Sequence, residues 1–289
     1  MERGKSMGGR AGVPVRVRRV SSELRELRLR SGLPAEEVAN ALGFSMSKLS
    51  RIENGQRGLR ADDVAALLGL YRVPVQRRDE LLALVRSGSD PNWWQVQNGR
   101  LPAMWSDVIR FEKEAVAIRN YETMFIPGLL QTAEYVGAIG RGTQPDIGVE
   151  ELDTLVSARL GRQALLSRAG APELEVLVEQ VALERPVGGP DIMHRQLRHL
   201  MDSAERDNIT IRVLPTALGA HPGMEGPFVL LEFADEPTLV YLEHRGNSAF
   251  LETAEHVAST TLTLEWLRDR ALSPEDSIEL VAAVARNFA

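Results

Sequence analysis

The side chains best suited to binding chemistry lie between Ala35 and Asn54. If the second half of this stretch is a helix with 100° between residues, Leu49 and Ile52 mark its buried side. The opposite side then carries hydroxyl and guanidinium groups that can hydrogen-bond to base edges in the major groove of DNA, and a methionine that can contact a thymine methyl group. The candidates for reading bases are Met46, Ser47, Ser50 and Arg51.

A second set of side chains around the same helix could bind DNA phosphates. Cationic and amide groups at such positions fix a protein on the duplex without reading its sequence. The candidates for phosphate contact are Lys48, Asn54, Arg57 and Arg60. The two sets together predict a nucleic-acid interface.

The elements that must position these side chains fit the pattern of a helix-turn-helix. Two helices that cross sharply through a three- to four-residue turn need a small residue where they touch and a glycine in the turn. Ala39 and Gly43 meet these two requirements, and Phe44 would cover the turn. The shared core would be filled from both helices by Val38, Leu42, Leu49 and Ile52. A solvated polar face on an ordinary helix bundle is the alternative, but it does not require all these features together.

The fold class that we expect is an all-α helix-turn-helix bundle followed by an α+β domain. About five short helices are predicted within residues 21–88, the first of them capped by Ser21 or Ser22. Residues 1–20 carry six basic residues and no apolar periodicity, so we expect a flexible basic tail that could reach into a DNA groove. Residues 89–106 are expected to form a linker. Its Trp93 and Trp94 suit interdomain packing, with partner or ligand contact as the alternative.

An α+β domain is predicted for residues 107–289, because helical patterns occur before, between and after short strand patterns. Strands are expected at 174–183 and 209–214, with a hairpin formed by 228–233 and 238–243. The expected helices lie near residues 107–140 (broken at Pro127), 150–168, 190–206, 253–271 and 275–286.

Charge divides the chain at the same place. Residues 1–88 hold 17 Lys and Arg against 10 Asp and Glu, a balance of +7. Residues 89–289 hold 17 against 30, a balance of −13. A basic segment joined to an acidic remainder is expected when the first part meets a polyanion and the second has another task.

Several function classes are excluded or disfavoured by residue content. The chain has no cysteine, which excludes disulfides, thiolate zinc sites and a cysteine nucleophile. No apolar run reaches membrane-spanning length and the start lacks a signal-peptide pattern, so we expect a cytoplasmic, nucleoid-associated protein that does not contact membranes. His194 and His199 are five residues apart rather than four, and we expect no metal and no cofactor.

The loop around residues 219–227 is the remaining candidate for chemistry. His221 and Glu225 could act there as acid and base, but a simple turn or a partner or ligand contact fits the glycine and proline content better. Common hydrolase and nucleotide-binding motifs are missing from the sequence. We therefore do not expect an enzyme, and a DNA-tethered hydrolase that uses His221 ranks last.

Residues 24–73 resemble the Xre-type helix-turn-helix domain shared with lambdoid phage repressors. The resemblance is carried by L-R-E-L-R, V-A-N-A-L-G-F-S and K-L-S-R-I-E-N-G. In that family the second helix often begins with a glutamine that fixes a phosphate. This sequence has Ala35 instead, although the free N–H groups of the helix could still bind a phosphate.

The remainder resembles the regulatory domain of actinobacterial Scr-type, antitoxin-like, WhiJ-like regulators. The matching stretches include R-N-Y-E-T-M-F-I-P-G-L-L-Q-T-A-E-Y and V-L-P-T-A-L-G-A-H-P-G-M-E-G-P-F. The resemblance implies a regulator whose C-terminal domain receives a signal, commonly from a small protein encoded by an adjacent gene.

The sequence thus predicts a sequence-specific transcription regulator that binds double-stranded DNA as a homodimer on an inverted repeat. Its C-terminal domain would dimerise, receive a signal, or both. Two alternatives stay open: an antitoxin-like interaction module with autoregulatory DNA binding, and a regulator that responds to a small molecule.

Overall fold

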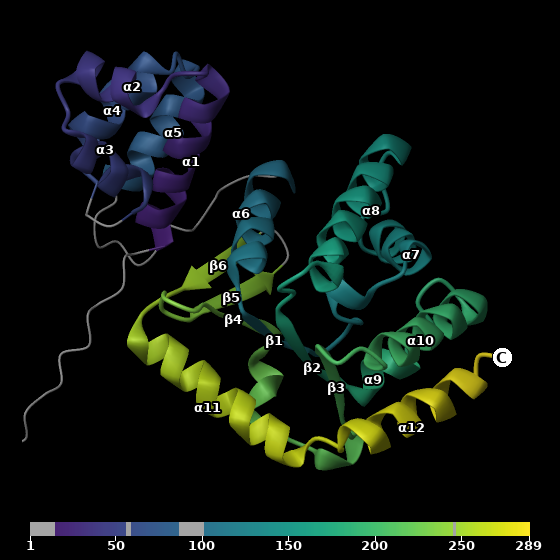
Figure 1. Cartoon of the computed structure of the whole chain (residues 1–289). Coiled ribbons are helices and arrows are strands. Elements are labelled where there is room, and N and C mark those ends of the chain that lie inside the picture. The colour runs from purple at the N-terminus through teal and green to yellow at the C-terminus, as the bar shows by residue number, and fades with distance from the viewer. Residues whose placement is uncertain (1–14, 56–58, 87–100, 245–246) are drawn as a thin grey trace, which may run out of the picture. The chain divides into compact units, whose positions relative to one another are not determined.

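The computed structural model describes residues 15–55, 59–86, 101–244 and 247–289. Figure 1 traces the chain, which divides into two compact units of residues 1–97 and 98–289. Each unit has its own core and is described by itself.

The N-terminal unit is all-α, as predicted. Its helices share a core that includes Leu24, Leu49, Leu67 and Leu81, each at most 1% exposed. The helices are α1 (Val15–Ser31), α2 (Ala35–Leu42), α3 (Met46–Glu53), α4 (Ala61–Leu70) and α5 (Val75–Arg86).

The start of α1 differs from the sequence prediction. The helix begins at Val15, so the tail that we expected over residues 1–20 was wrong for residues 15–20. The expected cap at Ser21 or Ser22 was also wrong, because both residues lie inside the helix. Val17 and Val20 continue the apolar stripe of the helix into the core, and Ser21 is buried within it. The spacing of these valines outweighs the basic residues between them. Residues 1–14 lie outside the described part of the chain.

The C-terminal unit is built on a six-stranded mixed sheet with the order β3-β2-β1-β4-β5-β6. The first three strands are parallel, and β4 starts an antiparallel half by pairing with β1. The strands are β1 (Ala117–Glu122), β2 (Glu173–Glu179), β3 (Ile209–Leu214), β4 (Phe228–Glu232), β5 (Leu239–His244) and β6 (Asn247–Leu251).

Helices cover both faces of this sheet (Figure 1). On one face, Leu264 and Leu267 of α11 pack on Tyr121 and Leu177. On the other, Phe111 of α6 packs edge-on against a strand phenylalanine. The helices of the unit are α6 (Leu101–Glu114), α7 (Ala133–Thr143), α8 (Val149–Gln163), α9 (Gln180–Glu184), α10 (Pro190–Ala204), α11 (Ala254–Arg270) and α12 (Pro274–Arg286).

The predicted fold class is confirmed, with corrections to individual elements. The hairpin, the strand at 209–214 and the final helices are present as predicted. However, β1 lies inside the region predicted as helix, and β2 ends at Glu179, after which α9 begins. We did not predict β6. The central strand β1 was missed because its sequence, A-I-R-N-Y-E, places polar residues on both faces and lacks the usual alternation of apolar and polar residues.

Candidate nucleic-acid interface

The turn between α2 and α3 is closed by hydrogen bonds on both sides. Gly43 ends α2 in the left-handed conformation (φ 65°), and the Phe44 N–H donates to the Ala39 carbonyl at 2.8 Å. A left-handed residue at this position is best supplied by glycine. Ser45 then caps α3, because its hydroxyl oxygen accepts from the Lys48 N–H at 3.1 Å. The turn that the sequence predicted at Gly43 is therefore present.

The inner side of α3 joins the core, and its outer side faces solvent. Leu49 and Ile52 are buried, at 1% and 6% exposure. The four residues predicted to read bases are exposed, and the Arg51 Nε donates to the backbone carbonyl of Ser47 at 3.1 Å. The structure thus brings together Met46, Ser47, Ser50 and Arg51 on one accessible surface, which we call the outer face of α3.

The residues predicted to bind phosphates have unlike environments. Asn54 is exposed at the end of α3, and its side-chain amide donates to the Ser50 hydroxyl at 3.1 Å. Arg60 is exposed at the start of α4. Arg57 lies outside the described residues. The two described residues that are exposed can approach a phosphate from the ends of neighbouring helices.

Lys48 is held within the unit. Its Nζ lies 2.7 Å from Asp63 Oδ1 and 3.8 Å from the centroid of the Phe44 ring. The expected phosphate contact of Lys48 would therefore have to compete with an ion pair that already exists.

The start of α2 has a mixed electrostatic character. Pro34 precedes the helix without a side-chain cap, so free N–H groups face outward there. Glu36 and Glu37 stand exposed in the first turn. Their negative charges interact favourably with the helix dipole, but they also repel the phosphate that the sequence analysis allowed at this terminus.

A buried ion pair behind α3 was not found from the sequence. Glu53 accepts two hydrogen bonds from Arg28 of α1, at 2.7 and 2.9 Å, and its side chain is only 7% exposed. The contact with Glu53 raises the pKa of Arg28, and burial beside this carboxylate raises the pKa of Tyr71. Glu53 follows Leu49 by four residues, so its place on the buried side of α3 was a signal that it needs a cationic partner.

The C-terminal unit separates the two residues that were predicted as an acid–base pair. Glu225 is exposed, whereas the His221 side chain is 6% exposed and its Nε2 lies 3.2 Å from Glu179 Oε1. The same oxygen accepts a hydrogen bond from the Tyr121 hydroxyl at 2.8 Å, and the His221 ring stacks on Trp266. The contact between the His221 imidazole and Glu179 therefore connects the loop after β3 to the carboxyl end of β2.

The loop that carries His221 also depends on a glycine. A Cβ atom on Gly223 would lie 2.6 Å from the Tyr121 hydroxyl oxygen, a distance that real Cβ atoms do not reach. The backbone at Gly223 consequently packs directly on the Tyr121 ring. Burial and the neighbouring Glu179 raise the pKa of Tyr121, so its hydroxyl stays protonated and can donate.

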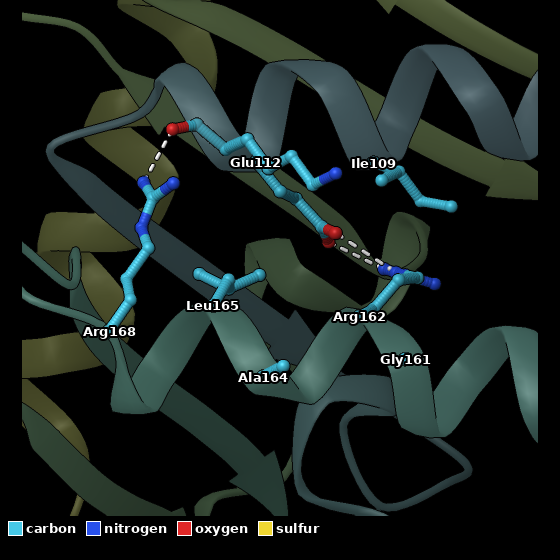
Figure 2. Close-up of a pocket in the computed structure, with 8 residues that line it drawn as sticks. Ile109, Glu112, Gly161, Arg162, Ala164, Leu165 and Arg168 are labelled. Atoms are coloured by element: carbon cyan, nitrogen blue, oxygen red, sulfur yellow. Dashed lines mark hydrogen bonds and ion pairs between the residues drawn. The ribbon is translucent and has the colours of Figure 1, made fainter.

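A small cavity of about 270 Å³ lies between α6 and α8, and Figure 2 shows its lining. Glu112 and Arg162 form a two-fold hydrogen-bonded ion pair at 2.5 and 2.9 Å, and both are nearly buried. Arg168 donates to the backbone carbonyl of Lys113. Because these groups bond to one another, they hold the helices together, and we assign no ligand to this cavity.

The remaining candidates give no site in the described residues. Trp93 and Trp94 lie outside the described part of the chain. Within the described ranges, no group of three or more His, Cys, Asp or Glu residues could hold a metal ion. Likewise, no helix among the residues that the structure describes is long and apolar enough to cross a membrane.

Comparison with known families agrees with this division of the chain. Residues 19–81 match a helix-turn-helix domain, so the N-terminal unit has the fold of a DNA-binding module. Residues 105–283 match a family described as a domain of unknown function (DUF5753), and because this match spans more than half of the chain, the protein belongs to that family. Comparisons with curated proteins and with solved structures gave no match.

Proposed function

We propose that this protein is a sequence-specific DNA-binding transcription regulator whose outer face of α3 reads base edges in the major groove. The observation that carries the proposal is the division of α3 into a buried apolar side and an accessible side of Met46, Ser47, Ser50 and Arg51. A recognition helix needs this division, because one side must be fixed by the fold and the other must meet the bases.

Among the exposed residues, Arg51 has the strongest capacity to discriminate. A guanidinium group can donate two hydrogen bonds to guanine O6 and N7, whereas the Ser47 hydroxyl can serve several bases. Arg51 bonds within its own helix only to a backbone carbonyl, so its charge is available to DNA. Asn54 and Arg60 would fix the register on the phosphates.

We further propose that the protein acts as a homodimer on an inverted repeat. A helix of eight residues covers only a few base pairs, and two-fold symmetry doubles the site. The C-terminal unit would dimerise, receive a signal from a small partner protein, or both, as its resemblance to antitoxin-like WhiJ-like regulators suggests. If the partner exists, adding the small protein encoded by an adjacent gene changes the affinity for the preferred duplex; if a metabolite is the signal, that protein has no effect.

The proposal includes no catalytic step. The DNA-tethered hydrolase considered from the sequence would need the His221 imidazole to reach substrate, and His221 is buried against Trp266 and bonded to Glu179.

The test is Arg51→Ala in the full chain, with a duplex selected by the wild-type protein from a randomised library. Loss of a bidentate contact should cost about 1–3 kcal/mol of binding on that duplex and relax the preference at one base pair. Arg72→Ala is the matched control. It removes an equal charge from an exposed residue that follows α4, at the end opposite to Arg60. The backbone at Arg72 has a φ of 54°, and alanine is no more strained than arginine in this conformation.

Fluorescence anisotropy on selected and random duplexes measures both variants. Discrimination should fall for Arg51→Ala and stay close to the wild-type value for Arg72→Ala. Equal losses on selected and random DNA for Arg51→Ala would remove this residue from the reading role.

A further inference from the structure

Lys48 connects three elements of the N-terminal unit. It belongs to the first turn of α3, and its ammonium group lies 2.7 Å from Asp63 Oδ1 in the first turn of α4. The same group stands 3.8 Å from the centroid of Phe44, which lies in the turn before α3. One side chain therefore contacts the helix that follows α3 and the turn that precedes it.

The charge of Lys48 is already balanced. The Lys48 and Asp63 side chains are 37% and 19% exposed, so the pair is partly shielded from water and its carboxylate is the less accessible partner. An approaching phosphate would meet a neutral pair rather than a cation. Arg51, which bonds to a backbone carbonyl, keeps its full charge for a ligand.

The position of this ion pair matters because α3 is short. Its contacts with the core come mainly from Leu49 and Ile52. The Glu53–Arg28 ion pair fixes the C-terminal end of α3, and the Lys48–Asp63 pair fixes the N-terminal end. Packing of Leu49 and Ile52 fixes which side of the helix is buried, and the two pairs add directional contacts at its two ends that limit smaller rotations about its axis.

On the basis of the proposed function, we propose that Lys48 is a positioning residue that sets the direction of the outer face of α3, and that it does not bind a DNA phosphate. Its contacts with Asp63 and Phe44 determine where Met46, Ser47 and Arg51 point. Its loss therefore reduces discrimination between sequences more than it reduces affinity for DNA in general.

The key variant is Lys48→Met combined with Asp63→Asn. The double substitution removes the ion pair and leaves its net charge at zero, so a change in long-range attraction to DNA does not obscure the result. The full chain is used, with the duplex selected by the wild-type protein and a random duplex of equal length. Affinity for each is measured over a range of salt concentrations.

Two results are expected for the double variant. The slope of log K against log salt on random DNA stays at the wild-type value, because no phosphate contact is lost. The ratio of affinities for the selected and random duplexes falls roughly tenfold, as expected for a displaced base contact. Each single substitution should lower this ratio by a similar factor, and the double variant should lower it no further.

Lys48→Arg is the conservative control. Arginine can reach Asp63, so this variant should keep most of the discrimination. Melting of each variant is followed by circular dichroism. A variant that unfolds loses binding to both duplexes together, which differs from the expected loss of their ratio.

A slope whose magnitude falls by about 0.9 in the double variant would overturn the proposal, because this is the change for one lost phosphate contact. Unchanged discrimination in the double variant would also overturn it. The proposed function fails separately, if the wild-type protein enriches no duplex from the library.

Discussion

The two units of the protein differ in where their most important charged side chains lie. In the N-terminal unit, Arg51 and its polar neighbours lie on the surface of α3, and the core beneath them is mainly apolar, with one buried ion pair between Glu53 and Arg28. In the C-terminal unit, carboxylates such as Glu112 and Glu175 are buried and bonded to arginines. Surface charges can be replaced without loss of the fold, whereas buried pairs link elements that are far apart in the sequence. Substitution of a buried charge in the C-terminal unit will therefore lower the stability of the fold, whether or not the residue has a role in function.

The largest effect that we predict follows from Glu175 on β2. Its carboxylate accepts hydrogen bonds from Arg268 at 2.8 and 2.6 Å and lies within 4.0 Å of Arg119 and Arg212. Glu175→Gln leaves these arginines without their shared anion, and we expect the free energy of unfolding to fall by about 3–5 kcal/mol. Urea denaturation of the full chain measures this value.

An exposed pair in the same unit is the control for this prediction. Glu134 and Arg195 are bonded at 3.0 Å, but both side chains are about half exposed. Glu134→Gln should leave the urea midpoint at the wild-type value, since solvent screens such pairs. Similar losses for the two variants would contradict the distinction between buried and surface charge.

A smaller loss is expected in the N-terminal unit, from Glu53→Gln. The variant removes the charge that accepts two hydrogen bonds from Arg28, and we expect a cost of about 2 kcal/mol. Thermal denaturation measured through the helical signal tests this value. Glu26→Gln, which removes the exposed pair with Arg30, is the control and should leave the melting temperature nearly unchanged. No difference between the two variants would show that the Glu53 pair has no special role in stability.

The last effect is a dependence of stability on pH in the C-terminal unit. Burial, and then the negative charge of Glu243, raise the pKa of Glu122 from 4.5 to about 8, although Asn120 and Arg159 act in the opposite direction. The native state therefore holds a proton at Glu122 that the unfolded chain releases above pH 4.5. Stability from this group is present below pH 4.5 and is lost as the pH rises to about 8.

We expect the free energy of unfolding to fall as the pH rises from 5 to 8, and Glu122→Gln to reduce this slope. Urea titrations at several pH values measure both. If the variant and the wild type gave the same slope, another group would have to carry the pH dependence.

Local rules predicted the N-terminal unit well. Gly43 and Ala39 met the geometric needs of the turn, and the 3.6-residue period separated Leu49 and Ile52 from the exposed residues of α3. The Lys48–Asp63 and Arg28–Glu53 pairs were not predicted, because each joins residues that are 15 or more positions apart. Spacing within one helix carries no information about such partners.

The C-terminal unit was less predictable because its centre is unusual. The central strand β1 contains Arg119 and Asn120, which bond to Glu173 of β2 and to the Phe228 carbonyl of β4, and a single sequence does not reveal these partners. The buried contact between His221 and Glu179 also joins segments 42 positions apart. The hairpin of β4 and β5 was predicted, since its alternation and its turn are local.

The most direct test of the central claim is a titration of the isotope-labelled full chain with the selected duplex, followed by backbone amide resonances. We predict that the largest changes fall on residues 46–51 of α3 and on Arg60, and that a random duplex changes the α3 resonances much less. Changes that spare α3 and lie on other surfaces would contradict the account, because the outer face of α3 would then not meet the bases.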